Sequence, residues 1–311
     1  MRVFVTGASG WVGRGLVPEL IAAGHEVVGL ARSEAAAQAL RTAGVDVLRG
    51  SLDDLEVLRD AAAASDGVVH LAFRHDVAFA GDYAGATASD RAAIEALGAG
   101  LVGTSRPLVI ASGILGVLGL APGQLATERD GLAAAPGDGS SPIDGGQGRL
   151  GNAHDALALA DRGVRSSVVR LPPATHGEGD NGFVPAAIAF AREAGAAAYV
   201  GDGANRWPAV HRDDAARLFR LALEAAPAGS VLHAVGEEGV PIREVAEVLA
   251  AHLDLPAVSV APERASDHVG FLGRFWAIDG PASSRITREL LGWEPTGPGL
   301  IADLEAGHYF A

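Results

Sequence analysis

The sequence has no cysteine and no lysine, and aromatic residues make up only 5% of its 311 positions. Without cysteine the chain cannot form disulfides, thiolate metal sites or a cysteine nucleophile. No apolar run approaches the roughly eighteen residues that a membrane-spanning helix requires. We therefore expect a soluble protein that makes no use of thiol chemistry and does not span a membrane.

Positive charge is also scarce, because 24 basic residues stand against 38 acidic ones and the formal net charge is -14. Nucleic acids and anionic membranes both require a basic face, so neither is expected as a partner. The ten histidines are scattered and show no metal-ligand spacing, so no metal site is predicted. The N-terminal residues already read as a strand, which predicts no targeting segment and a cytoplasmic location.

A glycine-rich turn, Thr6–Gly13, follows a short apolar run and precedes a helix-like stretch. Gly7 permits a tight exit from the strand, Gly10 lets the backbone approach a pyrophosphate, and Gly13 allows the helix to pack on the sheet. The free N–H groups and the dipole of the helix N-terminus favour the anion. A second apolar run, 25–30, completes a β-α-β unit. This context predicts a dinucleotide site.

The first half of the chain alternates apolar runs with alanine- and leucine-rich stretches, which predicts an α/β fold with a doubly wound parallel sheet. Ser33 and Asp53 are the expected N-caps of two helices. The predicted strands are 2–6, 26–30, 46–49, 68–71, 108–111, 167–171 and 231–234. The predicted helices are 12–23, 33–43, 53–63, 89–99, 148–161, 183–194, 213–226 and 242–252.

Residues 113–148 are rich in glycine, proline and serine, and we expect a long loop there that is functional or mobile. The pattern divides the chain into two regions. Residues 1–170, joined by 205–235, form the expected cofactor-binding core. Residues 171–204 and 236–311 form the expected substrate-binding region.

Several separated motifs resemble those of the extended short-chain dehydrogenases/reductases. They are Thr-Gly-x-x-Gly-x-x-Gly at 6–13, Val-His-Leu-Ala at 69–72, Val-Ile-Ala-Ser-Gly at 109–113, Val-Arg-Leu-Pro-Pro at 169–173, Val-His-Arg-Asp-Asp at 210–214 and Leu-Gly-Trp-Glu-Pro at 291–295. The resemblance implies a Rossmann core that binds NAD(P), with the nicotinamide near the carboxyl ends of the central strands.

The end of the second strand indicates which nicotinamide cofactor is used. Ala31 offers no carboxylate for the ribose hydroxyls of NAD, whereas Arg32 and Ser33 can both donate hydrogen bonds to a 2′-phosphate. We therefore expect NADPH rather than NADH. The expected cofactor-binding residues are Gly7, Ser9, Gly10, Trp11, Val12, Gly13, Arg32, Ser33, Leu52, Leu71, Ala72, Phe73, Ser112, Arg149, Pro172 and Pro173.

The catalytic pattern departs from the family. Most members place a proton-donating tyrosine four residues before a lysine, and here those positions hold Gly145 and Arg149. Arg149 can hold the ribose and stabilise an oxyanion, but its pKa is too high for routine proton donation. The chain resembles an atypical subgroup in which basic residues replace the usual pair. Ser112 matches the family's serine, so Ser112 and Arg149 are the expected catalytic residues.

Three sources remain for the proton: Ser112 as a relay from water, a histidine, or the substrate itself. His75, His176 and His211 adjoin family motifs, whereas His154 lies five positions after Arg149 and would point about 140° away on a helix. Phe271–Trp276 gathers aromatic residues that form either a small core or a lid over an apolar ligand. The expected substrate-contacting residues are His75, Gly113, His176, Phe271, Phe275 and Trp276.

These features predict an NADPH-dependent ketoreductase acting on a bulky polycyclic aromatic ketone, whose own phenol assists where the tyrosine is missing. The composition and the unusual site resemble those of actinobacterial polyketide reductases of the angucyclinone type. Two alternatives stay open: a nicotinamide-dependent isomerase, epimerase or dehydratase, and a non-enzymatic NADP(H) sensor or scaffold. The oligomeric state also stays open.

Overall fold

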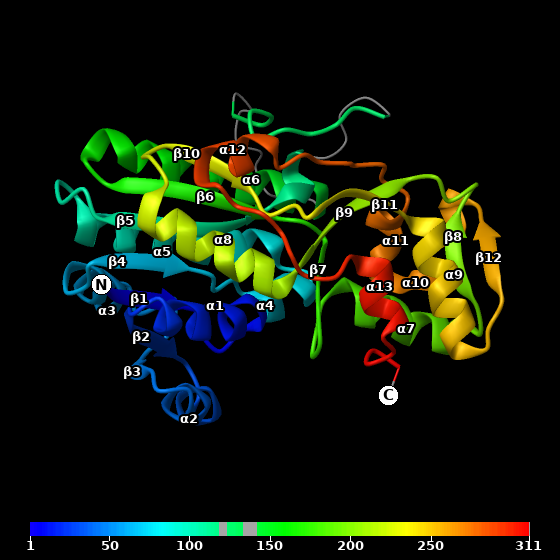
Figure 1. The fold of residues 1–311 in the computed structure, drawn as a ribbon, viewed down its shortest axis with the longest axis horizontal. Coiled ribbons are helices and arrows are strands. Elements are labelled where there is room, and N and C mark those ends of the chain that lie inside the picture. The colour runs from blue at the N-terminus through cyan, green and yellow to red at the C-terminus, as the bar shows by residue number, and fades with distance from the viewer. Residues whose placement is uncertain (118–122, 133–141, 311) are drawn as a thin grey trace.

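The computed structural model describes residues 1–117, 123–132 and 142–310. Its centre is a seven-stranded sheet in the order β10-β6-β5-β4-β1-β2-β3, with every neighbouring pair parallel (Figure 1). The strand order reverses between β1 and β4, where ligands bind in open parallel sheets. The strands are β1 (Arg2–Thr6), β2 (Glu26–Ala31), β3 (Asp46–Arg49), β4 (Gly67–His70), β5 (Pro107–Gly113), β6 (Arg165–Leu171) and β10 (Ser230–His233). The predicted doubly wound α/β fold is confirmed.

Helices cover both faces of this sheet (Figure 1). On one face α1 (Trp11–Ala22) and α8 (Arg212–Ala225) pack together, and their core includes Leu16, Phe219 and Trp293. On the other face lie α3 (Leu55–Ala63), α5 (Tyr83–Leu101) and α6 (Pro142–Ala158). Strand residues are buried on both sides because both faces are covered. The remaining elements of this part are α2 (Glu34–Thr42), α4 (His75–Phe79) and α12 (Arg285–Leu291).

Two small sheets build the rest of the molecule, at the right of Figure 1. One has the order β11-β9-β7 and the other pairs β12 with β8. Their strands are β7 (Ala174–His176), β8 (Ala197–Val200), β9 (Arg206–His211), β11 (Glu237–Pro241) and β12 (Ala257–Val260). The helices are α7 (Phe183–Ala194), α9 (Ile242–Leu253), α10 (Ala265–Val269), α11 (Gly273–Trp276) and α13 (Leu300–Glu305).

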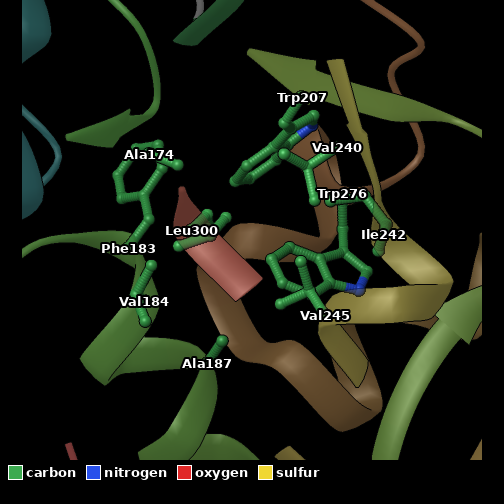
Figure 2. Close-up of a pocket in the computed structure, with 10 residues that line it drawn as sticks. All are labelled: Ala174, Phe183, Val184, Ala187, Trp207, Val240, Ile242, Val245, Trp276 and Leu300. Atoms are coloured by element: carbon green, nitrogen blue, oxygen red, sulfur yellow. The ribbon is translucent and has the colours of Figure 1, made fainter. Parts of the chain in front are cut away.

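The core of this second part is apolar and tightly filled. The indoles of Trp207 and Trp276 meet edge to face at 5.1 Å, and Figure 2 shows both beside Phe183 and Leu300. The space between these side chains is only about 10 Å³, roughly one water-sized probe, so it is a packing gap. Phe275 and Trp276 are buried in this core, whereas Phe271 is 46% exposed.

Several predicted boundaries are wrong. The third helix begins at Leu55, because Asp54 rather than Asp53 is its N-cap. The helix predicted at 148–161 begins at Pro142 and ends at Ala158, and the helix predicted at 89–99 extends from Tyr83 to Leu101. The Ser33 cap is confirmed, since its hydroxyl accepts a hydrogen bond from the Ala36 N–H at 3.2 Å.

The predicted loop at 113–148 is only partly testable, because 118–122 and 133–141 lie outside the described residues. Its two ends are ordered elements, a 3-10 turn at Ile114–Val117 and the first turns of α6. The prediction also missed β7, β8, β9, β11 and β12, which have only three to six residues each. Among the described residues, no helix combines the length and the apolar character needed to cross a membrane.

Candidate cofactor and active site

The turn between β1 and α1 has the close packing that its glycines predict. Gly7 has φ +71°, and a Cβ on it would lie 2.7 Å from the Ala72 nitrogen. A Cβ on Gly13 would lie 2.2 Å from the Gly7 carbonyl oxygen. α1 begins after Gly10, with no side-chain cap and no acidic residue in its first turn. Its first N–H groups are therefore placed to receive an anion.

A cavity of about 340 Å³ lies beside this turn, at the carboxyl ends of β1, β2 and β4. Seven of the predicted cofactor-binding residues line it together: Gly7, Ser9, Arg32, Ser33, Leu52, Ala72 and Phe73. Seven further lining residues were not predicted from the sequence: Leu30, Ala36, Gly50, Ser51, Asp53, Arg74 and Asp76.

The charged residues that line the cavity form ion pairs along its rim. Arg32 Nη1 lies 3.2 Å from Asp76 Oδ2, and Arg74 Nη1 lies 3.1 Å from Asp53 Oδ2. Arg49 holds the backbone of Ser33 in place, because its Nη1 donates to the Ser33 carbonyl oxygen at 2.6 Å. The only sequence signal for these residues is their position just after β3 and β4, where a parallel sheet presents its ligand-binding edge.

A buried polar network ties the turn to α5 and α6. Thr6 Oγ1 accepts from the Ala72 N–H at 3.3 Å and lies 2.7 Å from His70 Nδ1. His70 Nε2 lies 3.1 Å from Asp90 Oδ1, and Asn152 Nδ2 donates to Asp90 Oδ2 at 2.7 Å. Desolvation opposes ionisation of Asp90, but His70, Arg149 and Asn152 together lower the pKa of its carboxyl. A buried negative charge therefore sits behind the site.

Arg149, on α6, reaches the carboxyl end of β5. Its Nη2 donates to the Ala111 carbonyl oxygen at 3.1 Å, and its guanidinium lies over the Phe73 ring at 4.3 Å. Its buried Nε has no hydrogen-bond partner, and no carboxylate of the described residues lies within 4.0 Å. Desolvation lowers the pKa of Arg149, and the charge of Asp90 opposes that shift. Arg149 is thus a largely desolvated cation with no contact counter-ion in the part of the chain that the structure describes.

Other predicted residues gather around Arg149. Ser112, which is buried, and Gly113 are the last two residues of β5, and a Cβ on Gly113 would lie 3.9 Å from Arg149 Nη1. The His75 ring meets Phe73 edge to face at 5.0 Å. Desolvation and the Arg149 charge lower the pKa of His75. Gly145 lies one turn before Arg149 on α6.

A second buried cation, Arg170, lies next to Ser112. It was not predicted from the sequence as a site residue. Arg170 on β6 is the register partner of Ser112, and His233 on β10 is the partner of Arg170. Arg170 Nη1 donates to the Asp130 carbonyl oxygen at 2.8 Å and to His233 Nε2 at 3.3 Å. Desolvation lowers the pKa of Arg170 to about 10 and that of His233 to about 3. This pair anchors the 123–132 segment against the end of the sheet.

The remaining predicted substrate-contacting residues lie on elements of the second part of the molecule. His176 is fully buried, with its Nδ1 2.8 Å from Asp303 Oδ2 on α13, and its ring meets that of His211 at 5.6 Å. Phe275 and Trp276 belong to the core of the second part.

Further predicted cofactor residues connect β7 with α1. Pro172 and Pro173 connect β6 to β7, where the Trp11 indole donates to the Thr175 carbonyl oxygen at 2.9 Å. Val12 and Leu71 pack against the core that α1 and α8 share.

Comparisons with known proteins identify the family and the fold of the chain. Residues 3–96 match the model of the NAD dependent epimerase/dehydratase family. An uncharacterized protein of Schizosaccharomyces pombe is 47% identical over 310 residues, covering 100% of both chains. The 2-alkyl-3-oxoalkanoate reductase of Stenotrophomonas maltophilia is 32% identical over 272 residues, covering 84% of this chain and 78% of that one.

A solved structure shows the same fold at lower identity. The dTDP-glucose 4,6-dehydratase of Streptomyces venezuelae, crystallised with NAD and TYD bound, is 22% identical with a TM-score of 0.76. The match covers 98% of this chain and 96% of that one.

Proposed function

Because the chain belongs to the NAD-dependent epimerase/dehydratase family of extended short-chain dehydrogenases/reductases, we propose that it is an NADPH-dependent ketone reductase. The observation that carries this proposal is Arg149, a cation with no carboxylate of the described residues within 4.0 Å, placed beside Ser112 at the end of β5. A desolvated cation stabilises a negative charge that develops on a substrate oxygen far better than an exposed one does.

The cofactor half of the proposal rests on the cavity and the glycine turn. The turn has no room for a Cβ at Gly7 or Gly13, and the start of α1 has no side-chain cap, so its N–H groups are available to a pyrophosphate. Arg32 and Ser33 line the cavity where the adenosine ribose would lie, which favours a 2′-phosphate over a free hydroxyl. These residues fit NADPH.

The dinucleotide would be held by the glycine turn, Arg32 and Ser33, and when bound it would supply the hydride for reduction of a carbonyl. Arg149 would hold the cofactor ribose and stabilise the negative charge that develops on the carbonyl oxygen of the substrate, and Ser112 would orient that carbonyl. The oxygen takes its proton from water relayed through the Ser112 hydroxyl or the His75 imidazole. Arg149 stays protonated throughout, because even a lowered guanidinium pKa is too high for donation near neutral pH.

The relative with reductase activity favours 3-oxo acids as the first substrates to test. Neither that reductase nor the fungal relative is described as acting on a polycyclic ketone. The aromatic substrate predicted from the sequence is therefore tested as one member of a panel of ketones. We would measure NADPH consumption with 2-alkyl-3-oxo acids, simple ketones and fused aromatic ketones. The proposal predicts turnover with at least one class.

The matched variants are Arg149→Met and Arg165→Met. Within the described ranges, the Arg165 side chain likewise donates only to backbone carbonyl oxygens, those of Ala226 and Leu223, but it lies at the amino end of β6. Loss of one oxyanion donor typically lowers kcat by about 10²–10³-fold, so we expect that loss for Arg149→Met and little change for Arg165→Met. Equal kcat values in the two variants would contradict the proposed role of Arg149.

The solved dehydratase structure motivates a second outcome for the same assay. Two results together would favour an isomerase or dehydratase over a reductase. They are oxidised cofactor that stays bound through purification and conversion of a sugar nucleotide without net oxidation or reduction. Tight NADPH binding without turnover on any substrate would leave only a sensor or scaffold.

A further inference from the structure

Four charged side chains alternate in sign along the rim of the cofactor cavity, in the order Arg32, Asp76, Arg74, Asp53. Arg32 Nη1 lies 3.2 Å from Asp76 Oδ2, Arg74 Nε lies 3.9 Å from Asp76 Oδ1, and Arg74 Nη1 lies 3.1 Å from Asp53 Oδ2. All four residues line the cavity, so the chain of charges belongs to the site and not to a remote surface.

The Arg32–Asp76 pair joins two separate loops. Arg32 follows β2, whereas Asp76 lies in the first turn of α4, which follows β4. Both side chains are exposed, 66% and 54%, so water weakens the attraction between them. Arg32 and Arg74 hold the pKa of the Asp76 carboxyl below its usual range against desolvation, which raises it. Asp76 therefore stays charged near neutral pH.

A 2′-phosphate brings almost two negative charges and three acceptor oxygens to the same arginine. It is a stronger partner for a guanidinium than one carboxylate that water screens. Asp76 thus occupies the cation that the phosphate needs, and it also repels the phosphate directly. A ligand without the 2′-phosphate has no group that competes with the Asp76 carboxylate for Arg32.

We infer that Asp76 is a specificity-determining residue: its carboxylate competes with the cofactor's 2′-phosphate for Arg32, and so limits the preference for NADPH over NADH. The inference rests on the proposed use of NADPH. It assigns to α4 a role in cofactor selection that the end of β2 alone does not provide. Arg74, which Asp53 also holds, is the second cation available to the phosphate.

The test uses two small ligands that differ only in the 2′-phosphate, adenosine 2′,5′-bisphosphate and adenosine 5′-monophosphate. Their affinities for the full chain would be measured by calorimetry, without any reaction. Removing one exposed like charge beside the phosphate should tighten the bisphosphate about three- to tenfold in Asp76→Asn and leave the monophosphate unchanged. Arg32→Gln should weaken the bisphosphate alone.

The control is Asp267→Asn, which removes the carboxylate of another exposed pair, Arg264–Asp267 at 3.2 Å, in α10. It should change neither affinity. In the Arg32→Gln background, Asp76→Asn should lose the part of its effect that comes from releasing Arg32, and should keep only the smaller part that comes from direct repulsion and from the longer 3.9 Å contact with Arg74. A full effect in that background would overturn the competition, since direct repulsion would explain it.

The failures are distinguishable. If the parent chain binds neither ligand, the proposed cofactor site fails. If it binds the bisphosphate and the monophosphate equally, the NADPH assignment fails, and this inference fails with it. If it prefers the bisphosphate but Asp76→Asn changes nothing, only the role of Asp76 is overturned.

Discussion

Asp180 ties the C-terminal residues to the segment between β7 and α7, and its replacement tests the electrostatics of that junction. Its Oδ1 accepts from the Gly182 N–H at 2.7 Å, and its Oδ2 accepts from the Tyr309 hydroxyl at 3.1 Å. The Tyr309 oxygen in turn accepts from the Gly177 N–H at 3.0 Å. Desolvation raises the pKa of Asp180 to about 6 in spite of these donors. Ionisation of Asp180 therefore costs free energy in the folded chain.

The sign follows from the raised pKa. The folded chain binds this proton more tightly than the unfolded chain, whose Asp180 titrates near 3.8, so stability falls as pH rises through this window. A shift of about two pKa units corresponds to at most about 3 kcal/mol above pH 6, and relaxation around a partly exposed carboxyl reduces it. We expect Asp180→Asn to stabilise the fold by about 1–2 kcal/mol at about pH 8 and by much less at about pH 4.

Urea unfolding of both proteins at the two pH values measures this difference, and other titrating groups cancel between them. The control is Asp202→Asn, because Asp202 Oδ1 makes the same contact with the N–H two residues later, Ala204, at 3.0 Å but is exposed. It should show no pH-dependent gain. Equal effects of Asp180→Asn at both pH values would refute the argument, and so would destabilisation at the higher pH.

Three further substitutions test the turn, the polar network and the second core. Gly7→Ala should abolish NADPH binding and lower the free energy of unfolding by about 1–3 kcal/mol, because φ is positive and the new Cβ would meet the Ala72 backbone. The control is Gly44→Ala, which is also at positive φ but has open space around it. Its expected loss in thermal unfolding is only about 1 kcal/mol. Asp90→Ala leaves buried donors unpaired and should cost about 3 kcal/mol in urea unfolding; a loss under 1 kcal/mol would contradict the network. Trp276→Ala should cost about 3–5 kcal/mol and Phe271→Ala about 1 kcal/mol, because only the first is fully buried; comparable losses would contradict the packing.

The sequence was most informative where structure is local. The turn at Thr6–Gly13 predicted a strand, a tight exit and a helix start, because each glycine is required by its own backbone geometry. The Ser33 cap is equally local and is confirmed. The neighbouring cap at Asp53 was wrong. Asp54 Oδ2 accepts from the Ser51 N–H at 2.7 Å, and Asp53 instead pairs with Arg74, twenty-one positions along the chain.

Contacts between distant loops could not be predicted. Arg32 and Asp76 are forty-four positions apart, and only the folded sheet brings the ends of β2 and β4 together. The strands of the small sheets were missed for a related reason. β7 has three residues and β8 has four, too few to show alternation, and their partners lie elsewhere in the sequence.

Transfer of deuterium tests the central claim most directly. The chain would be incubated with a reactive ketone from the panel and NADPH that carries deuterium at C4 of the nicotinamide, on each face in turn. Reduction beside Arg149 and Ser112 predicts that one of the two labelled cofactors delivers its deuterium to the carbon that bears the new hydroxyl, as mass spectrometry of the alcohol would show. An alcohol without label from either cofactor would contradict the account, and so would product formed without NADPH consumption.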